Sequence, residues 1–159
     1  MTDDTQIDLR GFDNAGAAQA VGDALRAVIE EIQTIDEPLD FSRLTRIIVA
    51  VNFNTAIQEL RNETVSGNPI EYTNEEYAVA IAKVIILPDG DEYEIVPVLN
   101  ANFVGLLFSN DKSERRFAIH SIHHEMCHVH DNNKKIEMLF EHMLKTRLRG
   151  VDQFTYPLA

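Results

Sequence analysis

The feature that most constrains this chain is a histidine-rich segment at residues 120–131, which holds five of the six histidines. Inside it, residues 124–128 read His-Glu-Met-Cys-His and match the H-E-x-x-H pattern. Two histidines four residues apart lie one turn apart on the same face of an α-helix. Such a pair can hold one zinc ion, and the intervening glutamate can reach a zinc-bound water. The segment therefore predicts a helix, and the rest of the chain must supply the core behind it.

Hydrophobic periodicity predicts that this helix runs from about residue 114 to residue 129 and has two different sides. At 100° per residue, His124 and His128 lie within about 40° of each other. Phe117 lies on the same side and would wall the site. A separate core side is predicted from four apolar residues at helical spacing: Ala118, Ile122, Met126 and Val129. This separation of a core face from an imidazole face is what a zinc-binding helix needs.

The remaining polar residues near the motif are expected to have supporting roles or none. Asp131 suits a hydrogen bond to the second nitrogen of a ligating imidazole. Cys127 lies about 100° around the helix from His128 and is expected to be a small, partly buried side chain. Surface or supporting positions are expected for His120, His123 and His130, and solvated positions for Arg115 and Arg116.

The chemistry that this motif predicts is hydrolysis assisted by zinc. His124 and His128 would be two metal ligands, and a catalytic zinc normally has three protein ligands and one open position. Glu125 would be the general base that takes a proton from the zinc-bound water and passes it to the leaving amine.

This arrangement resembles the zincin superfamily of zinc metallopeptidases, through the five motif residues and the order of the expected elements. The resemblance implies an α+β fold in which a backing helix and a small mixed sheet precede the motif helix and a C-terminal helix. It also implies a zinc cofactor and a peptide or protein substrate that adds as a strand to a sheet edge. By this analogy the segment 92–99 or the segment 103–108 would line the cleft.

The third zinc ligand departs from the familiar patterns of this superfamily. The metzincin form would need a histidine six residues after the second one, and that position is Lys134. The gluzincin form, which the chain resembles more, uses a glutamate on a later helix. Three alternatives stay open: Glu137, Glu141, or a residue beyond position 159 if this chain is a fragment of a longer one. His142 points away from the apolar stripe of the last helix and is a poorer candidate.

Local patterns predict the other elements. Residues 1–12 are expected to be a mobile acidic tail, followed by a helix that Asp13 or Asn14 caps and that reaches Gln33. A strand at 44–51, a helix at 53–61 capped by Asn54, a hairpin of strands 78–87 and 92–99, and a strand at 103–108 are expected next. Pro97 suggests an edge position or a bulge. Asp131-Asn132-Asn133 is expected to break the motif helix before a last helix at 134–149.

Composition limits the classes of partner and compartment. The 159 residues favour one domain, and the net charge of −12 argues against nucleic acid and anionic membranes as partners. The single Cys127, the lack of a signal-like N-terminus and the lack of an apolar run of 18 residues indicate a cytoplasmic protein without a membrane span. The alternatives to a peptidase are a non-catalytic zinc-binding or partner-binding domain and an inactive, truncated peptidase fragment.

Overall fold

The computed structural model describes residues 5–35, 39–42, 44–63, 70–74, 78–87 and 90–148. The fold is α+β, as expected. In chain order its elements are β1 (Gln6–Arg10), α1 (Ala15–Ile35), β2 (Arg46–Ala50), α2 (Phe53–Glu63), β3 (Ile70–Asn74), β4 (Ala78–Leu87), β5 (Gly90–Asn100), α3 (Ala101–Val104), the 3-10 helix η1 (Gly105–Phe108) and α4 (Lys112–Leu148). None of the described helices is long and apolar enough to cross a membrane.

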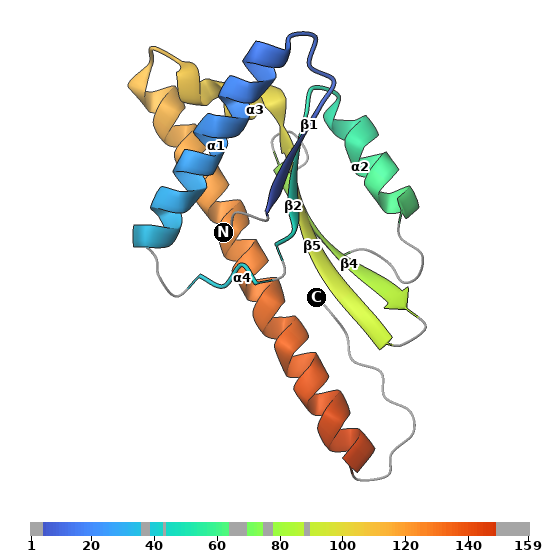
Figure 1. Ribbon diagram of the computed structural model, residues 1–159. Helices are drawn as coiled ribbons and strands as arrows, with labels where there is room; N and C mark the ends of the chain where they lie inside the picture. Colours follow the sequence, from blue (N-terminus) through green and yellow to red (C-terminus); the bar gives the residue numbers. More distant parts are fainter. Residues whose placement is uncertain are drawn as a thin grey trace.

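The sheet has the strand order β1-β2-β5-β4-β3, and helices cover both of its faces. Strands β1, β2 and β5 are parallel, whereas β4 is antiparallel to both β5 and β3. Helices α1 and α4 pack on one face and α2 packs on the other (Figure 1). Along β2, Val49 faces the first of these layers and Ile48 faces the second, which is the alternation of a strand buried on both faces.

The expectation of a mobile tail over residues 1–12 is wrong for residues 6–10, which form the edge strand β1. This strand pairs with β2 in parallel, from Gln6 opposite Arg46 to Arg10 opposite Ala50. Its apolar side chains, Ile7 and Leu9, pack against the core beneath α1. Two apolar residues in a short acidic stretch give a weak periodic signal, so the strand depends on a neighbour that lies forty residues away.

The hairpin of β4 and β5 agrees with the prediction. Strand β5 is an inner strand of the sheet, but Pro97 lies in the part of it that pairs only with β4 among the described strands. Strand β5 lies between β2 and β4, and Pro97 is opposite Ala80. Proline cannot donate a backbone hydrogen bond, and the ladder from β5 to β2 begins at Val98, the next residue. The missing donor therefore falls just before the parallel ladder begins.

The segment 103–108 is helical, so the strand expected there is wrong. The side chain of Asn100 accepts a hydrogen bond from the backbone N–H of Asn102 and caps α3, which leads directly into η1. A short apolar run does not distinguish a strand from a buried helical turn. The segment 103–108 is not a strand, so this alternative for the strand lining the cleft is wrong. Strand β5 pairs with β2 only from Val98 to Asn100, so its earlier residues pair with β4 alone among the described strands. The edges are β1 and β3.

Helix α4 is continuous from Lys112 to Leu148, so the predicted break at residues 131–133 is wrong. The Nδ2 of Asn132 donates to the carbonyl oxygen of His128 over 3.0 Å, and the Nδ2 of Asn133 donates to the carbonyl oxygen of Asp40 over 2.5 Å. Both asparagines are buried. Asparagine side chains often compete with the helix for backbone hydrogen bonds. Here the side chain of Asn132 bonds to the helix itself, and that of Asn133 bonds to the segment 39–42.

The sequence predicts caps at Asp13 or Asn14 for α1, at Asn54 for α2 and at Asp111 or Ser113 for α4, and two of these three predictions are confirmed. Asn14 caps α1 by accepting hydrogen bonds from Gly16 and Ala17. Asp111 caps α4, because its Oδ1 accepts from the backbone N–H of Ser113 over 2.8 Å. The cap expected at Asn54 is wrong, because Asn54 lies inside α2 and the first helical bond runs from Ala56 to the carbonyl oxygen of Asn52.

Candidate metal site

Helix α4 has the two sides that its sequence predicts. The four residues of the predicted core face are fully buried, with exposed fractions of 0%: Ala118, Ile122, Met126 and Val129. On the other side His124 is exposed and His128 is half-buried. The packing of the apolar face against β2, β5 and α1 therefore fixes the rotation of α4 and turns the histidine pair outward.

The two motif histidines point their ring nitrogens at each other. Their Nε2 atoms are 3.0 Å apart, and their ring centroids are 4.5 Å apart with the ring planes at 88°. Two zinc–nitrogen bonds of about 2.0–2.1 Å at a tetrahedral angle place the nitrogens about 3.3 Å apart. The pair therefore converges as two ligands of one zinc ion would.

Glu125 is buried beside this pair, with an exposed fraction of 3%. Its Oε2 atom has no hydrogen-bond partner among the described residues. Burial raises the pKa of Glu125 from 4.5 to about 7, because the charged form loses its hydration. A buried carboxyl oxygen without a hydrogen-bond partner is rare in proteins, and a bound water molecule or metal ion would supply the missing partner. His124 and His128 fit zinc as a pair of ligands, whereas Glu125 does not belong to any described group of three side chains that could hold a metal.

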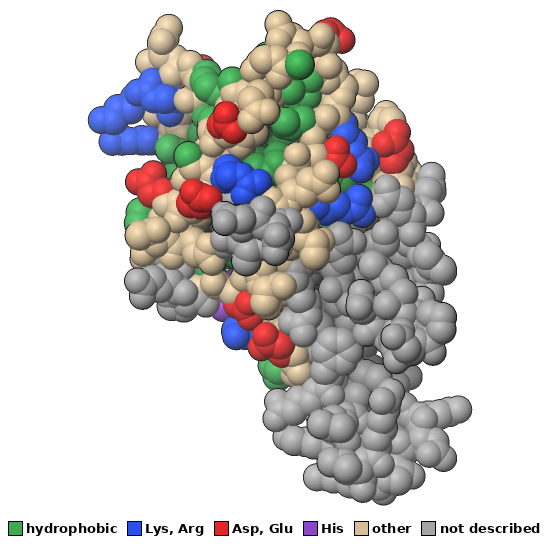
Figure 2. Space-filling view, viewed as in Figure 1, with side chains coloured by type: hydrophobic (Ala, Val, Ile, Leu, Met, Phe, Trp, Pro, Cys, Tyr) green, Lys and Arg blue, Asp and Glu red, His purple; other side chains and the backbone are tan. Residues whose placement is uncertain are grey.

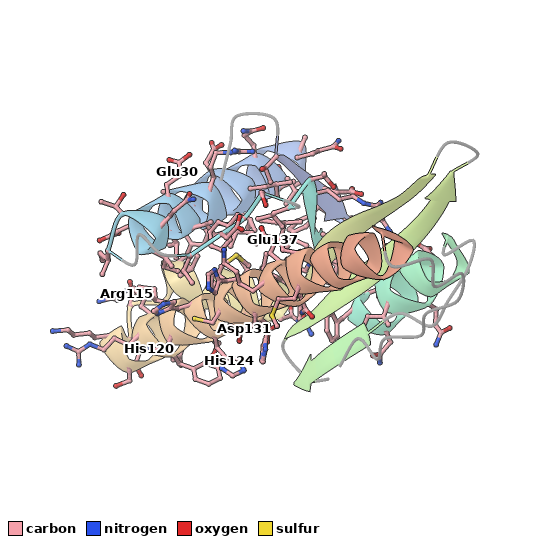
Figure 3. All side chains as sticks on the ribbon, turned by 90° about the horizontal axis from the view of Figure 1, so that it is seen from below. Glu30, Arg115, His120, His124, Asp131 and Glu137 are labelled. Atoms are coloured by element: carbon pink, nitrogen blue, oxygen red, sulfur yellow. The ribbon has the colours of Figure 1, made fainter. Side chains whose placement is uncertain are left out.

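The described residues contain no group of three or more His, Cys, Asp or Glu side chains that could hold a metal. Glu137 could reach the histidine pair only if a separate last helix folded back against the motif helix. Helix α4 is one continuous helix and does not fold back. Figure 3 places His120, His124 and Asp131 along one side of α4 and Glu137 on the other side, toward α1. The Oε2 of Glu137 lies 3.5 Å from the Nζ of Lys134. Glu137 is therefore not a third ligand to this pair within one chain.

Glu141, the second candidate, has a side chain outside the described residues. Its backbone lies in α4 thirteen residues past His128, which is about 20 Å along the helix axis. That distance exceeds the reach of a glutamate side chain back to the histidine pair. Among the candidates from the sequence, only a ligand from outside the described part of the chain stays open.

The other residues near the motif lie mostly where the sequence places them. His120 is exposed and Cys127 is half-buried, as expected. Asp131 is exposed, and among the described residues it makes no hydrogen bond to an imidazole, so the role expected for it is not seen. Phe117 is 42% exposed, and its ring meets that of Phe103 edge-on with centroids 5.9 Å apart. Arg115 differs, because its Nη1 donates to the carbonyl oxygen of Ser109 over 2.6 Å and so closes the end of η1.

The segment 39–42 is a part of the site region that the sequence alone does not reveal. The backbone N–H of Asp40 donates to the Nδ1 of His130 over 2.7 Å, and Asn133 holds the Asp40 carbonyl from the next turn of α4. His130 is thus an anchor for this segment rather than a surface residue. The only local sign is Asp40-Phe41-Ser42, in which Asp40 Oδ1 accepts a hydrogen bond from the Ser42 backbone over 2.9 Å.

The carboxyl group of Asp40 belongs to the same anchor. Burial raises its pKa, but hydrogen bonds from the backbone and side chain of Ser42 oppose this effect. Contact with Glu137 and the positive charge of Lys134, 3.5 Å away, lower the pKa further, to about 2. Asp40 is therefore an ionised group that ties the segment to α4 one turn beyond the motif.

Comparisons of the chain with protein-family models, with curated proteins and with solved structures found no match. The site has to be interpreted from its own geometry.

Proposed function

We propose that this protein is a zinc-dependent peptidase with a zincin-like arrangement of its motif helix. The observation that carries the proposal is the convergence of His124 Nε2 and His128 Nε2, 3.0 Å apart, on a helix that also carries the buried Glu125. Two histidines one helical turn apart with a glutamate between them in the sequence are the residues that metal-assisted hydrolysis uses.

Each of the three residues has a distinct role in this proposal. His124 and His128 hold the zinc through their Nε2 atoms, and zinc, when bound, polarises the scissile carbonyl and acidifies the attacking water. Glu125 accepts a proton from that water at its carboxylate and donates it to the leaving amine.

A polypeptide substrate is supported by the open edge of the sheet. Among the described strands, β3 pairs only with β4 and is an edge of the sheet to which an extended peptide can add. The part of β5 before Val98 also pairs only with β4 among the described strands, and we propose that substrate adds at one of these two strands. The third zinc ligand comes, on this proposal, from outside the described residues.

Metal content tests the ligand assignment. Elemental analysis of the purified wild type should find about one zinc per chain, and His124→Ala and His128→Ala should each lose it. His120→Ala is the matched control, because His120 is an exposed histidine one turn away on the same side of α4. A wild type without zinc after zinc loading and removal of free metal would refute the site.

Activity tests the role of Glu125 separately from the ligands. Glu125→Gln should keep the zinc and lose at least about 100-fold in kcat on a mixture of fluorogenic peptides, because it removes the proton acceptor. Glu114→Gln is the control, since Glu114 is an exposed glutamate on the same helix. Full turnover in Glu125→Gln would rule out this mechanism.

One observation favours a second candidate, a non-catalytic zinc-binding domain. The exposed His124 and half-buried His128 are the only ligands that the described residues supply. Two histidines from a second molecule would close the zinc with four protein ligands and leave no position for water. Zinc-dependent dimerisation in sedimentation, with one zinc per two chains and no peptide hydrolysis, would favour this candidate over the peptidase.

A further inference from the structure

A cavity of about 170 Å³ lies at the carboxyl ends of β1 and β2, lined by residues other than those of the motif. Its lining comes from the residues that end these strands and from the first turns of α2, including Arg10, Ala50 and Thr55. The volume equals the liquid volume of about six water molecules. The cavity is therefore suited to a small ligand rather than to a peptide.

The position of the cavity in the sheet is one at which parallel sheets bind ligands. Strand β1 leads into α1 on one face, and its neighbour β2 leads into α2 on the opposite face (Figure 1). The two connections diverge at the strand ends and leave a crevice between them. Ligand sites of open parallel sheets lie in such crevices, outside the carboxyl ends of the strands.

Small residues keep this crevice open. Ala50 and Ala56 are buried in its floor, with exposed fractions of 1% and 2%. Gly11 has a φ of 81°, and a Cβ added there would lie 3.3 Å from the Cβ of Val51. Larger side chains at these positions would fill the space or strain the turn after β1.

Charged groups of both signs line the cavity. Arg10 donates from Nη1 to the Oε2 of Glu59 over 3.3 Å and from Nε and Nη2 to the Oδ2 of Asp8, which is not a lining residue, over 3.0 and 2.8 Å. Acidic and basic side chains also lie next to each other over β1 and α2 on the face in Figure 2. A simple anion would meet the two carboxylates, and a simple cation would meet the guanidinium. A ligand that carries both charges matches both groups.

We propose that this cavity binds a small free α-amino acid. Its carboxylate lies toward Arg10 and the hydroxyl of Thr55, and its ammonium group lies toward Glu59. The side chain points toward the small residues of the floor. This proposal does not rest on the proposed peptidase function, because none of the three motif residues lines the cavity.

Calorimetric titration of the full chain with glycine, L-alanine and L-serine tests the proposal. Saturable binding is expected, and acetate and methylammonium, each carrying one of the two charges, should bind at least about tenfold more weakly. Glu59→Gln should weaken binding of the amino acids about tenfold, because it removes the charged partner of the ammonium group. His124→Ala should leave the affinity unchanged.

Two controls keep the result interpretable. Glu30→Gln removes an exposed carboxylate from α1 and should not change the affinity. On titration of the wild type with these amino acids, the amide chemical shifts of Gly11 and Thr55 should move. This measurement uses no variant, so a folding defect cannot affect it. Acetate that binds as tightly as the amino acids, or a folded wild type with neither saturable heat nor shift changes, would overturn the proposal.

Discussion

Adjacent residues of α4 at the candidate site have opposite environments. A step of one residue turns the helix by 100°, so the exposed His124 is followed by Glu125, which is 3% exposed. The imidazoles can reach a metal from solvent. The carboxyl is held in a dry environment that raises its pKa to about 7.

The buried face of α4 should determine stability without determining metal binding. Met126→Ala is expected to lower the free energy of unfolding by about 2–5 kcal/mol, because it leaves a cavity in a fully buried position. Urea denaturation of the zinc-free protein measures this loss, with the exposed His120→Ala as the control within about 0.5 kcal/mol. A Met126→Ala variant as stable as the wild type would contradict the core assignment.

Asp40 should make stability depend on pH in the acid range. Its folded-state pKa of about 2 is below the ordinary 3.8, so its contribution is present above pH 3.8 and is lost as pH falls through about 2. The shift corresponds to about 2 kcal/mol. The difference in unfolding free energy between the wild type and Asp40→Asn should therefore shrink by about this amount between pH 6 and pH 2. A difference that does not change with pH would contradict the ion-pair and hydrogen-bond assignment.

At the scale of elements, the continuity of α4 decides which residues can join the site. Asn132 and Asn133 are held by hydrogen bonds to His128 and to Asp40, so the helix passes through residues that commonly end one. This keeps Glu137 on a different side of the same rigid helix from the histidine pair. If the helix ended at residues 131–133, the part that carries Glu137 could fold back toward the histidine pair.

Proline substitution tests this continuity. Asp131 is exposed, so Asp131→Pro alters chiefly the backbone and should cost about 3 kcal/mol or more in a helix interior. Asp131→Ala is the control, with little expected loss, because alanine favours the helix. Thermal or urea unfolding measures both. Toleration of proline would indicate that the helix does end near residue 131.

At the scale of the whole molecule, the edge strand β1 completes the parallel part of the sheet. It covers β2 along five residue pairs and places Ile7 and Leu9 beneath α1. With α2 on the other face, it also creates the crevice in which the proposed amino-acid site lies.

Removal of β1 should therefore destabilise the entire fold. Deletion of residues 1–10 is expected to lower the free energy of unfolding by at least about 3 kcal/mol, since the packing of Ile7 and Leu9 is lost with the ladder to β2. The control is Gln6→Ala, at an exposed position of the same strand. Circular dichroism during urea unfolding is the measurement. Unchanged stability after the deletion would mean that the segment is a dispensable tail.

Much of the local structure follows from the sequence. Periodic apolar residues locate α1, β2, the β4–β5 hairpin and the two sides of α4, and the five-residue motif locates His124 and His128 on one of those sides. The residues that define each of these elements lie within a few helical turns or a single strand of one another. Their apolar spacing can therefore be recognised from the local sequence alone.

The tertiary structure alone decided the features that depend on distant partners. Strand β1 forms because β2 lies beside it, α4 continues because Asp40 accepts a hydrogen bond from Asn133, and Glu137 is excluded because α4 does not fold back. The burial of Glu125 and the cavity at Arg10 likewise require elements that are far apart in the chain to pack together. Hydrogen bonds and packing contacts between segments that are far apart in the chain produce no periodic pattern in the local sequence. Only the folded structure could reveal them.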